Sequence, residues 1–395
     1  MSDILAKRLR HIKPSPTMAM TARAAELRAA GHDIIGLSAG EPDFNTPEHI
    51  KQAGIKAIED NFTSYTAVDG IPSLKQAIID KFARDNQLKY QASQILVSCG
   101  AKHSIYNVYQ TLLNPGDEVI IPAPYWVSYP DMVLLAEANP VIIETDLTQN
   151  YKITPEQLEA AITPKTKLFT LSSPSNPSGM VYTADELQAL AEVLLKHPQV
   201  YIISDDIYEH IYWANEPFKN ILMQVPELYE RTIMINGVSK AYSMTGWRIG
   251  YAAGPEIIIK AMKKLQSQST SNPASISQVA AAAALNGSQD CVVEMTEIYH
   301  HRQKMALPKL NRIKGFRCNE TQGAFYFFPD VSQAISQLGL SDDLQLAEFL
   351  LDKAQVALVP GTAFGLPNHM RLSYATSDAL LMEALDRIEK QLGCG

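Results

Sequence analysis

Short apolar segments alternate with helical patterns through the middle of the chain. The apolar segments predict strands at 94–100, 118–125, 141–145, 167–173, 201–206 and 232–237. Helical patterns occupy 101–113 and 126–138, and a further helix is expected to open at a capping box formed by Thr183 and Glu186. Strands that are apolar on both faces and separated by helices indicate an α/β fold with a mostly parallel sheet, covered by helices on each side.

The length and composition set limits on the kind of protein. A chain of 395 residues suggests one large domain with a smaller companion, or two similar domains. The hydrophobic content of 46% and mean hydropathy of -0.09 are typical of a soluble globular protein. Because the net charge is -8 and no basic stripe is present, nucleic acid and anionic membranes are not expected partners. An anionic small molecule would need a pocket with its own cations.

Other features argue against a secreted or metal-dependent protein. The cysteines are scattered without a CxxC pair, and the N-terminal residues lack the apolar core of a signal peptide, so a cytoplasmic location is expected. The nine histidines show no HExxH or comparable spacing, so no metal site is expected. No apolar run approaches the length that crosses a bilayer.

Candidate chemistry follows the predicted strands, because ligands of such sheets collect outside the carboxyl ends of the strands. Gly100 and Ala101 follow the first strand at a helix start, where free N–H groups favour a phosphate. Later strands are followed by Asn176, by Asp205 with Tyr208, and by Lys240. Each residue alone is readily explained as a cap or turn residue. Together they place an acid, an amide, a phenol and an amine around one edge.

Three cations need an explanation. Lys240 and Arg248 lie eight residues apart in the small and apolar stretch NGVSKAYSMTGWRIGYAAG, either as solvated surface charges or as groups that point into a site. Lys102 lies in the first turn of a predicted helix, where a cation opposes the helix dipole. Either Lys102 reaches into water or a neighbouring anionic ligand offsets the cost.

One cofactor needs all of these groups. A Schiff-base lysine, an anion site at a helix start, an arginine for phosphate and a buried acid for a protonated ring nitrogen together indicate pyridoxal 5'-phosphate (PLP). The sequence has no GxGxxG turn after its early strands and no GxxxxGK[ST] motif, which argues against nicotinamide and nucleoside triphosphate cofactors.

Several motifs in the same order make the chain resemble a known family. AGEPDF (39–44), PYWVSYP (124–130), SPSNPSG (173–179), DDIYEHIYW (205–213), the Lys240 stretch and MRLSYATS (370–377) resemble the class I aminotransferases of fold type I, and within them bacterial aspartate aminotransferases. The resemblance covers nearly the whole chain. It implies a seven-stranded, mostly parallel sheet in a large domain of residues 48–285, with a small α+β domain in 286–395 and an N-terminal arm and part of the small domain in 1–47.

The resemblance also implies roles around the cofactor. Lys240 would form the Schiff base, Arg248 would bind the phosphate with Gly100, Ala101 and Lys102, and Tyr65 would reach that phosphate from the second subunit of a homodimer. Trp126 would stack on the ring and adjoin the substrate. Asp205 would pair with the ring nitrogen, and Tyr208 and Asn176 would hydrogen-bond the ring oxygen. The catalytic residues would then be the following three: Lys240, Asp205 and Tyr208.

The implied substrates are amino acids and 2-oxo acids. Arg371, with Asn176 and the backbone of Gly40, would clamp the α-carboxylate, because a guanidinium grips a carboxylate with two parallel hydrogen bonds. In similar enzymes the second carboxylate meets the group at Lys102, Ser15 and Thr17. These residues imply L-aspartate with 2-oxoglutarate as substrates. Lys13 is at a position that would serve prephenate, and Pro16 replaces the alanine usual in relatives.

Two further readings remain open. A β-lyase or decarboxylase on the same fold would abstract the same proton or release CO₂ from a single amino acid. A cofactor-binding regulatory module would carry a basic helix-turn-helix extension, for which this chain has no spare residues. In the aminotransferase reading, Arg371 on the small domain and Lys240 on the large domain would draw the domains together when substrate binds.

Overall fold

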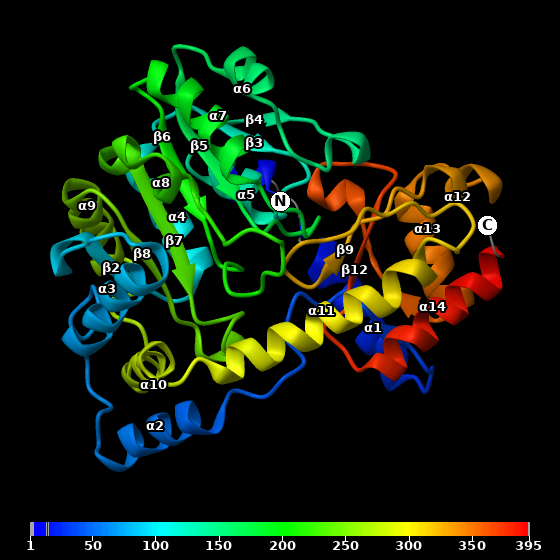
Figure 1. The fold of residues 1–395 in the computed structure, drawn as a ribbon, viewed down its shortest axis with the longest axis horizontal. Helices are drawn as coiled ribbons and strands as arrows, with labels where there is room; N and C mark the ends of the chain where they lie inside the picture. The colour runs from blue at the N-terminus through cyan, green and yellow to red at the C-terminus, as the bar shows by residue number, and fades with distance from the viewer. Residues whose placement is uncertain (1–3, 13, 15, 394–395) are drawn as a thin grey trace.

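The structure is a computed structural model that describes residues 4–12, 14 and 16–393, without the side chains of residues 16 and 17. Two bodies of secondary structure lie side by side in Figure 1, one built around a long sheet and one around short strands and helices. The long sheet contains seven strands in the order β2-β8-β7-β6-β5-β3-β4. Their bounds are β2 (Ile95–Ser98), β3 (Glu118–Pro122), β4 (Asn139–Ile143), β5 (Thr166–Ser172), β6 (Tyr201–Asp205), β7 (Thr232–Gly237) and β8 (Gly250–Ala253).

Helices cover both faces of this sheet, because successive strand residues point to opposite sides and both sides are apolar. In β6, Ile202 packs into one apolar cluster and its neighbour Ile203 into another. The Ile202 side is covered by α2 (Glu48–Glu59), α3 (Pro72–Asn86), α7 (Ala184–Lys196), α8 (Ile221–Gln224) and α10 (Ser275–Asn286). The Ile203 side is covered by α4 (Ala101–Leu112), α5 (Ser128–Leu135) and α9 (Glu256–Ser267), while α6 (Pro155–Ala161) precedes β5. The predicted α/β fold with a mostly parallel sheet is confirmed.

Strand β8 is the exception to the parallel arrangement, and the apolar pattern did not predict it. Its residues are glycine, tyrosine and two alanines, which carry little strand signal. It runs antiparallel to both β2 and β7, with Gly250 opposite both Ser98 and Gly237. The beginning of β8 therefore lies at the edge where β2 and β7 end. This register brings the residues just before β8 to the carboxyl edge of the sheet.

The second body has its own apolar cluster and two small sheets, β1-β10 and β11-β12-β9. The strands are β1 (Ile35–Gly36), β9 (Tyr326–Phe327), β10 (Val356–Ala357), β11 (Val359–Pro360) and β12 (Met370–Ser373). The helices are α1 (Pro16–Ala29), α11 (Asp290–Leu310), α12 (Ser332–Gln337), α13 (Asp343–Phe349) and α14 (Asp378–Leu392). Ser377 caps α14 by accepting a hydrogen bond from the Leu380 backbone N–H.

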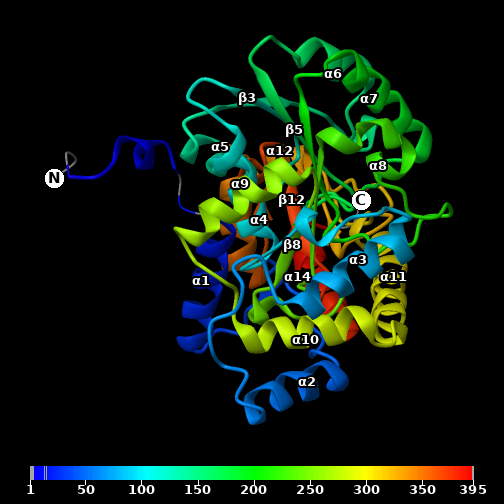
Figure 2. The ribbon, with the colours of Figure 1, turned by 90° about the vertical axis from the view of Figure 1, so that its left-hand side faces the viewer.

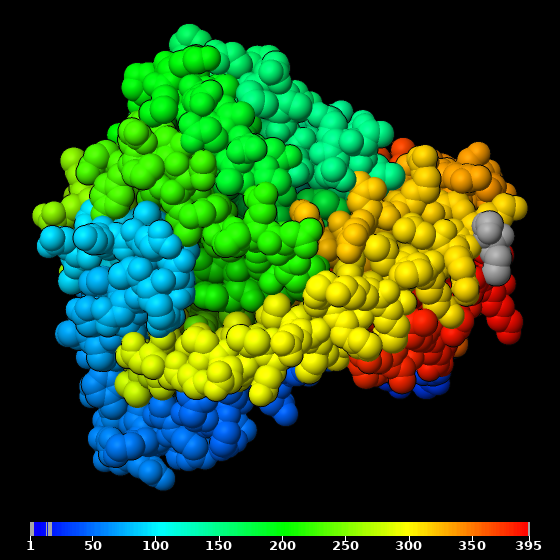
Figure 3. Space-filling view, viewed as in Figure 1, coloured from blue at the N-terminus to red at the C-terminus, as the bar shows by residue number. Residues whose placement is uncertain are grey.

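Helix α11 connects the two bodies. Val292 near its start belongs to the apolar cluster beside the long sheet, whereas Tyr299 and Ala306 belong to the cluster of the second body. Figures 1 and 3 show this helix, in yellow, running along the molecule from α10 to the body that holds α14. The elements of the long sheet lie between Glu48 and Asn286, but the division into domains at residues 47 and 285 stays a prediction.

Local signals at the helix ends account for the other agreements and differences. Thr183 and Glu186 form the predicted capping box of α7. The helix predicted over 126–138 is shorter, since α5 ends at Leu135 and Glu137 takes a left-handed conformation with φ of 59°. At the other end of the chain, the short helix η1 (Lys7–His11) lies at the side of the molecule, next to α5 (Figure 2).

Within the described residues, no helix has the length and apolar character needed to cross a membrane. The same residues contain no cluster of three or more His, Cys, Asp or Glu side chains suited to a metal ion.

Candidate active site

A cleft of about 650 Å³ opens outside the carboxyl ends of β5, β6 and β7, between the long sheet and the second body. It brings together ten of the residues predicted from the sequence: Gly40, Ala101, Lys102, Trp126, Asn176, Asp205, Tyr208, Lys240, Arg248 and Arg371. Gly100 adjoins them as the N-cap of α4. Tyr65 lies outside this cleft and is 93% exposed. Lys13 and Ser15, and the side chain of Thr17, lie outside the described part of the chain.

The start of α4 forms one end of the cleft. Gly100 has φ of 88°, a conformation that residues with a Cβ rarely adopt, and a Cβ there would overlap the Arg248 guanidinium. Arg248 donates hydrogen bonds to the carbonyls of Thr245 (3.0 Å) and Cys99 (3.3 Å). Gly250 begins β8, and a Cβ on it would collide with the backbone of Ala101. Two glycines thus let an arginine approach the free N–H groups of a helix start, which suits a phosphate group.

Asp205 ends β6 and is buried behind the cleft. The Tyr129 hydroxyl donates a 2.5 Å hydrogen bond to Asp205 Oδ2, and the Ile207 backbone N–H donates to Oδ1 at 3.3 Å. Burial raises the pKa of Asp205 to about 6, although these hydrogen bonds and the Lys240 charge favour its ionised form. The carboxyl is therefore ionised at pH 7 in a place where a cationic partner would stabilise it.

Lys240 follows β7, and its amine reaches across the cleft. Its Nζ donates a 2.6 Å hydrogen bond to the Gly40 carbonyl and lies 6.0 Å from the centre of the Tyr208 ring. Burial, together with the Arg371 and Arg248 charges, lowers the pKa of Lys240 to about 8. About a tenth of the amine is then neutral at pH 7 and about half at pH 8, and the neutral form is the one that a nucleophile or proton acceptor requires.

Arg371 lies on β12 at the opposite wall and is buried. Its Nη1 donates to Asn176 Oδ1 at 2.9 Å and its Nη2 to the Ser38 carbonyl at 2.6 Å, whereas its Nε has no hydrogen-bond partner among the described residues. Burial lowers the pKa of Arg371, but a guanidinium keeps its charge. A buried guanidinium without a carboxylate partner carries a large desolvation cost. The site is therefore built to receive an anion.

Lys102 supplies another cation in the same cleft. Its ammonium lies 4.9 Å from the centre of the Trp126 ring, and burial with the nearby Arg248 charge lowers its pKa. The residue is nevertheless exposed, so its position agrees with a lysine that reaches into water as well as with one beside an anionic ligand. The cleft thus holds an unpaired cation on α4 as well as Arg371 on β12.

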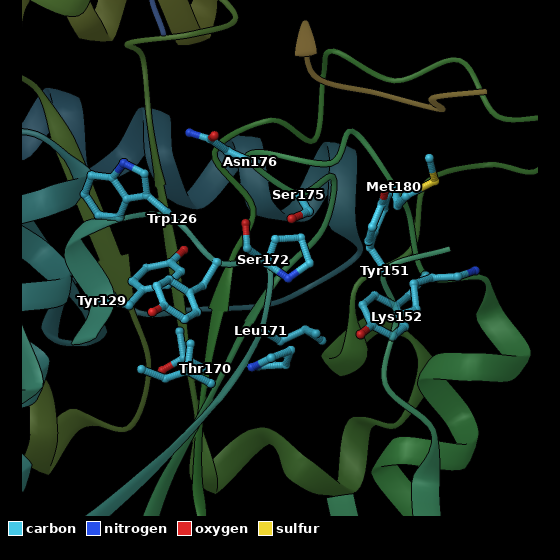
Figure 4. Close-up of a pocket in the computed structure, with 15 residues that line it drawn as sticks. Trp126, Tyr129, Tyr151, Lys152, Thr170, Leu171, Ser172, Ser175, Asn176 and Met180 are labelled. Atoms are coloured by element: carbon cyan, nitrogen blue, oxygen red, sulfur yellow. The ribbon is translucent and has the colours of Figure 1, made fainter. Parts of the chain in front are cut away.

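Two tyrosines of the site were not predicted. Figure 4 shows Tyr129 beside Trp126 in a small pocket of about 20 Å³. This pocket and the cleft share four lining residues: Trp126, Tyr129, Ser172 and Asn176. The helix predicted over 126–138 was a signal that could have identified Tyr129, because it would place Trp126 and Tyr129 on one face; in the structure α5 begins at Ser128. Tyr326, on β9, bonds the Tyr208 hydroxyl at 2.7 Å. Its place in the apolar run GAFYFFP gave no such signal.

The donor set fits PLP. Lys240 provides a partly neutral amine, Asp205 a buried acid, and Gly100 with Arg248 a phosphate cradle that a Cβ would fill. Asn176 uses its Oδ1 on Arg371, so its amide N–H groups remain to donate into the cleft. This combination is that of a PLP-dependent enzyme of fold type I.

Comparisons with known proteins give the same class and identify the family. The family model for class I and II aminotransferases matches residues 32–388, and the chain belongs to this PLP-dependent family. It is 56% identical over 394 residues to an aspartate/prephenate aminotransferase of Nitrosomonas europaea, covering 98% of this chain and 99% of that one. It is 53% identical over 386 residues to an aspartate aminotransferase of Geobacillus stearothermophilus, covering 98% of each.

Solved structures agree over the whole fold. The aspartate aminotransferase of Rhizobium meliloti superimposes with a TM-score of 0.93 at 48% identity, covering 97% of each chain. That of Thermus thermophilus, solved with maleate, superimposes with a TM-score of 0.92 at 42% identity, covering 98% of this chain and 99% of the other. The chain is therefore an aminotransferase that uses PLP.

Proposed function

We propose that the protein transfers the amino group of L-aspartate to 2-oxoglutarate, giving oxaloacetate and L-glutamate. The observation that carries this proposal is the unpartnered Nε of the buried Arg371, in a cleft that also holds the Lys102 ammonium. A dicarboxylic substrate has two carboxylates, and each would meet one of these cations. The names of the relatives from Geobacillus stearothermophilus and Rhizobium meliloti support the same substrate.

The cofactor would lie between α4 and Asp205. The backbone N–H of Ala101, the Arg248 guanidinium and the nearby Lys102 would hold its phosphate, and Trp126 would stack on its ring. Gly100 would adjoin the phosphate, while its own N–H donates to the Ser98 carbonyl at 2.7 Å. Tyr208 and Asn176 would donate hydrogen bonds to the ring oxygen, and Asp205 would keep the ring nitrogen protonated. When bound, the cofactor makes the substrate Cα proton acidic by withdrawing electrons from that carbon.

The protein's own groups then handle the substrate and its proton. Arg371, with Asn176 and the Gly40 backbone, would hold the α-carboxylate and so orient the Cα–H bond. Lys240 Nζ, in its neutral form, would accept the Cα proton and later return it to the other reacting carbon. The pKa of about 8 for this amine is suited to both directions of transfer near neutral pH.

Lys102 provides the test of the substrate side chain. Replacing Lys102 with glutamine is expected to lower kcat/KM for L-aspartate about 10- to 100-fold, because a hydrogen bond to a charged group contributes about 1.5 to 3 kcal/mol. The kcat/KM for L-alanine, which has no second carboxylate, should change much less. Because an effect of Lys102 on the cofactor would lower both values equally, the comparison isolates its effect on the second carboxylate. Lys264→Gln, on the exposed side of α9, is the matched control. An equal loss for both amino acids would contradict the proposed dicarboxylate preference.

Prephenate is a second candidate substrate. The name of the Nitrosomonas europaea relative includes it, and Lys13, with Ser15 and Thr17, lies in the segment that would meet the distal part of a substrate. Assays with prephenate and with L-phenylalanine would show whether this activity accompanies the first. Incubation with one amino acid and no 2-oxo acid tests the lyase and decarboxylase readings, since only those reactions would turn over continuously.

We propose that the protein is a homodimer in which Tyr65 completes the phosphate site of the partner subunit. Tyr65 follows α2 and is 93% exposed, and Ile55, Ile58 and Phe62 of the same segment are also exposed apolar residues. Ile4, in the N-terminal segment before η1, is 85% exposed. Exposed apolar groups gathered on one segment favour burial against another protein surface.

A mixing experiment tests the shared site. Tyr65→Ala and Lys240→Ala chains, each impaired alone, should regain about a quarter of wild-type activity after random re-association, since half the dimers are hybrids with one intact site. Mixing Tyr65→Ala with a chain carrying both substitutions is the control and should recover nothing. No recovery in the first mixture, with dimers present by sedimentation, would place Tyr65 outside the partner's site.

We also propose a two-domain arrangement with boundaries near residues 47 and 285, in which substrate binding draws Arg371 and Lys240 closer together. The unpaired thiols of Cys99, Cys291 and Cys318 support a reducing, cytoplasmic environment.

A further inference from the structure

Tyr326 links the two halves of the site, although it does not line the cleft. It lies on β9 of the second body, and its hydroxyl is 2.7 Å from that of Tyr208, which follows β6 of the long sheet. The same ring lies 4.7 Å from the Arg371 guanidinium carbon. β9 pairs with β12, the strand that carries Arg371, with Ser373 opposite Tyr326. A single fully buried side chain therefore contacts a cofactor-side phenol and the carboxylate-binding arginine.

The position of the Tyr326 hydroxyl is closely confined. A Cβ on Gly40 would lie 2.8 Å from the Tyr326 oxygen and 3.7 Å from Arg371 Nη1. Phe325 packs against both rings of the pair, at centroid distances of 4.7 Å from Tyr326 and 5.5 Å from Tyr208. The glycine backbone and the neighbouring ring leave the Tyr326 hydroxyl one available partner among the described residues, the Tyr208 hydroxyl.

The chemistry of the pair gives the hydrogen bond a direction. Burial raises the pKa of both phenols, so each keeps its proton at neutral pH. Either hydroxyl could donate to the other in the structure. When the Tyr208 hydroxyl donates a hydrogen bond to an anionic oxygen in the cleft, its proton is in use. The Tyr208 oxygen can then only accept the hydrogen bond from the Tyr326 hydroxyl. Hydrogen bonds arranged in such a chain strengthen one another.

We propose that Tyr326 is a positioning residue: its hydroxyl directs the Tyr208 proton toward the cofactor, and its ring holds the Arg371 guanidinium in place for the substrate carboxylate. The two actions belong to different parts of one side chain, so different substitutions separate them. Tyr326→Phe removes the hydroxyl and keeps the ring, whereas Tyr326→Leu removes both. The inference rests on the proposed cofactor and carboxylate sites.

The hydroxyl is tested by spectroscopy of the loaded protein without substrate. The visible band changes when a proton leaves the chromophore, and a hydrogen bond donated to the ring oxygen stabilises the deprotonated form. Tyr326→Phe should therefore raise the pH midpoint of this change by about 0.3 to 1 unit, the shift expected for a bond of about 0.5 to 1.5 kcal/mol. In a Tyr208→Phe background the same substitution should add no further shift, because the relay is already broken.

The ring is tested by steady-state kinetics with L-aspartate. Tyr326→Phe should leave KM within about twofold of wild type, while Tyr326→Leu should raise KM about 3- to 30-fold, as expected for loss of a buried cation–π contact. Tyr374→Phe is the control for both measurements. This variant loses a buried hydroxyl, just after β12, that is bonded to Thr321, and no contact between Tyr374 and Tyr208 is seen.

The outcomes separate this inference from the proposed function. A wild-type protein that shows no visible band with PLP, or no turnover of L-aspartate, contradicts the proposed function. The positioning role of Tyr326 is overturned by any of three results, provided that the wild type behaves normally. These are an unchanged pH midpoint in Tyr326→Phe, an equal shift of the midpoint in Tyr374→Phe, and an unchanged KM in Tyr326→Leu.

Discussion

Replacing Lys240 with alanine should reduce kcat by about 10⁴-fold or more, because the substitution removes both the covalent attachment of the cofactor and the group that carries the Cα proton. Lys240 Nζ is the amine that the structure places in the cleft with a lowered pKa of about 8, within hydrogen-bonding distance of the Gly40 carbonyl. Turnover of L-aspartate with 2-oxoglutarate measures the effect on the reaction.

A chemical measurement separates attachment from turnover. Borohydride reduction of the loaded wild type should fix the cofactor to the peptide that contains Lys240, as detected by mass spectrometry, and should fix none to the variant. The exposed Lys264 on α9 supplies the control, and Lys264→Ala should behave as wild type in both assays. Turnover of Lys240→Ala within tenfold of wild type would rule out this lysine as the proton carrier.

Replacing Asp205 with asparagine should have opposite effects on activity and stability. The variant leaves a protonated ring nitrogen without its buried counter-charge, and the loss of one partner of a buried charge pair costs about 3 to 5 kcal/mol. We therefore expect kcat/KM to fall about 10²- to 10³-fold. The amide oxygen of asparagine can still accept the Tyr129 hydrogen bond, so the local fold should persist.

The stability effect follows from the pKa of Asp205, raised to about 6 from its ordinary 3.8. An acid with a raised pKa in the folded state binds its proton more tightly there than in the unfolded state. The buried Asp205 therefore lowers the free energy of unfolding as the pH rises from about 4 to about 6. At pH 7 this loss amounts to about 3 kcal/mol. Without cofactor, Asp205→Asn should melt above wild type at pH 7, and about two thirds of this advantage should be gone at pH 4.5. Adding PLP should stabilise wild type more than the variant. A Tm for the cofactor-free variant below that of the cofactor-free wild type at pH 7 would contradict the expected gain in stability.

The sheet and its polar edge were predictable for a simple reason. Parallel strands bring their carboxyl ends to one edge, so Asn176, Asp205 and Lys240, each close behind an apolar strand, were expected to gather there. The cleft contains all three. Resemblance to aminotransferases supplied other candidate residues, among them Arg371, whose own strand is short and carries little pattern.

The contacts between segments far apart in the sequence were harder to predict. Tyr129 gave a local signal through its spacing from Trp126, but Tyr326 gave none, because an aromatic residue in an apolar strand is usually a core residue. Its hydroxyl acquires a role only when β9 pairs with β12 and comes to lie opposite Tyr208. Such pairings depend on the register of strands far apart in the sequence.

The sequence by itself determined the α/β class, the edge of the sheet that carries chemistry and the family, since these depend on local apolar patterns and short motifs. Only the tertiary structure decided where two of the cations lie and what surrounds them. Arg248 reaches Gly100 because β8 runs antiparallel between β2 and β7, and Arg371 is left with an unpartnered Nε because burial removes water from it. Both outcomes depend on contacts between segments far apart along the chain, which no local pattern encodes.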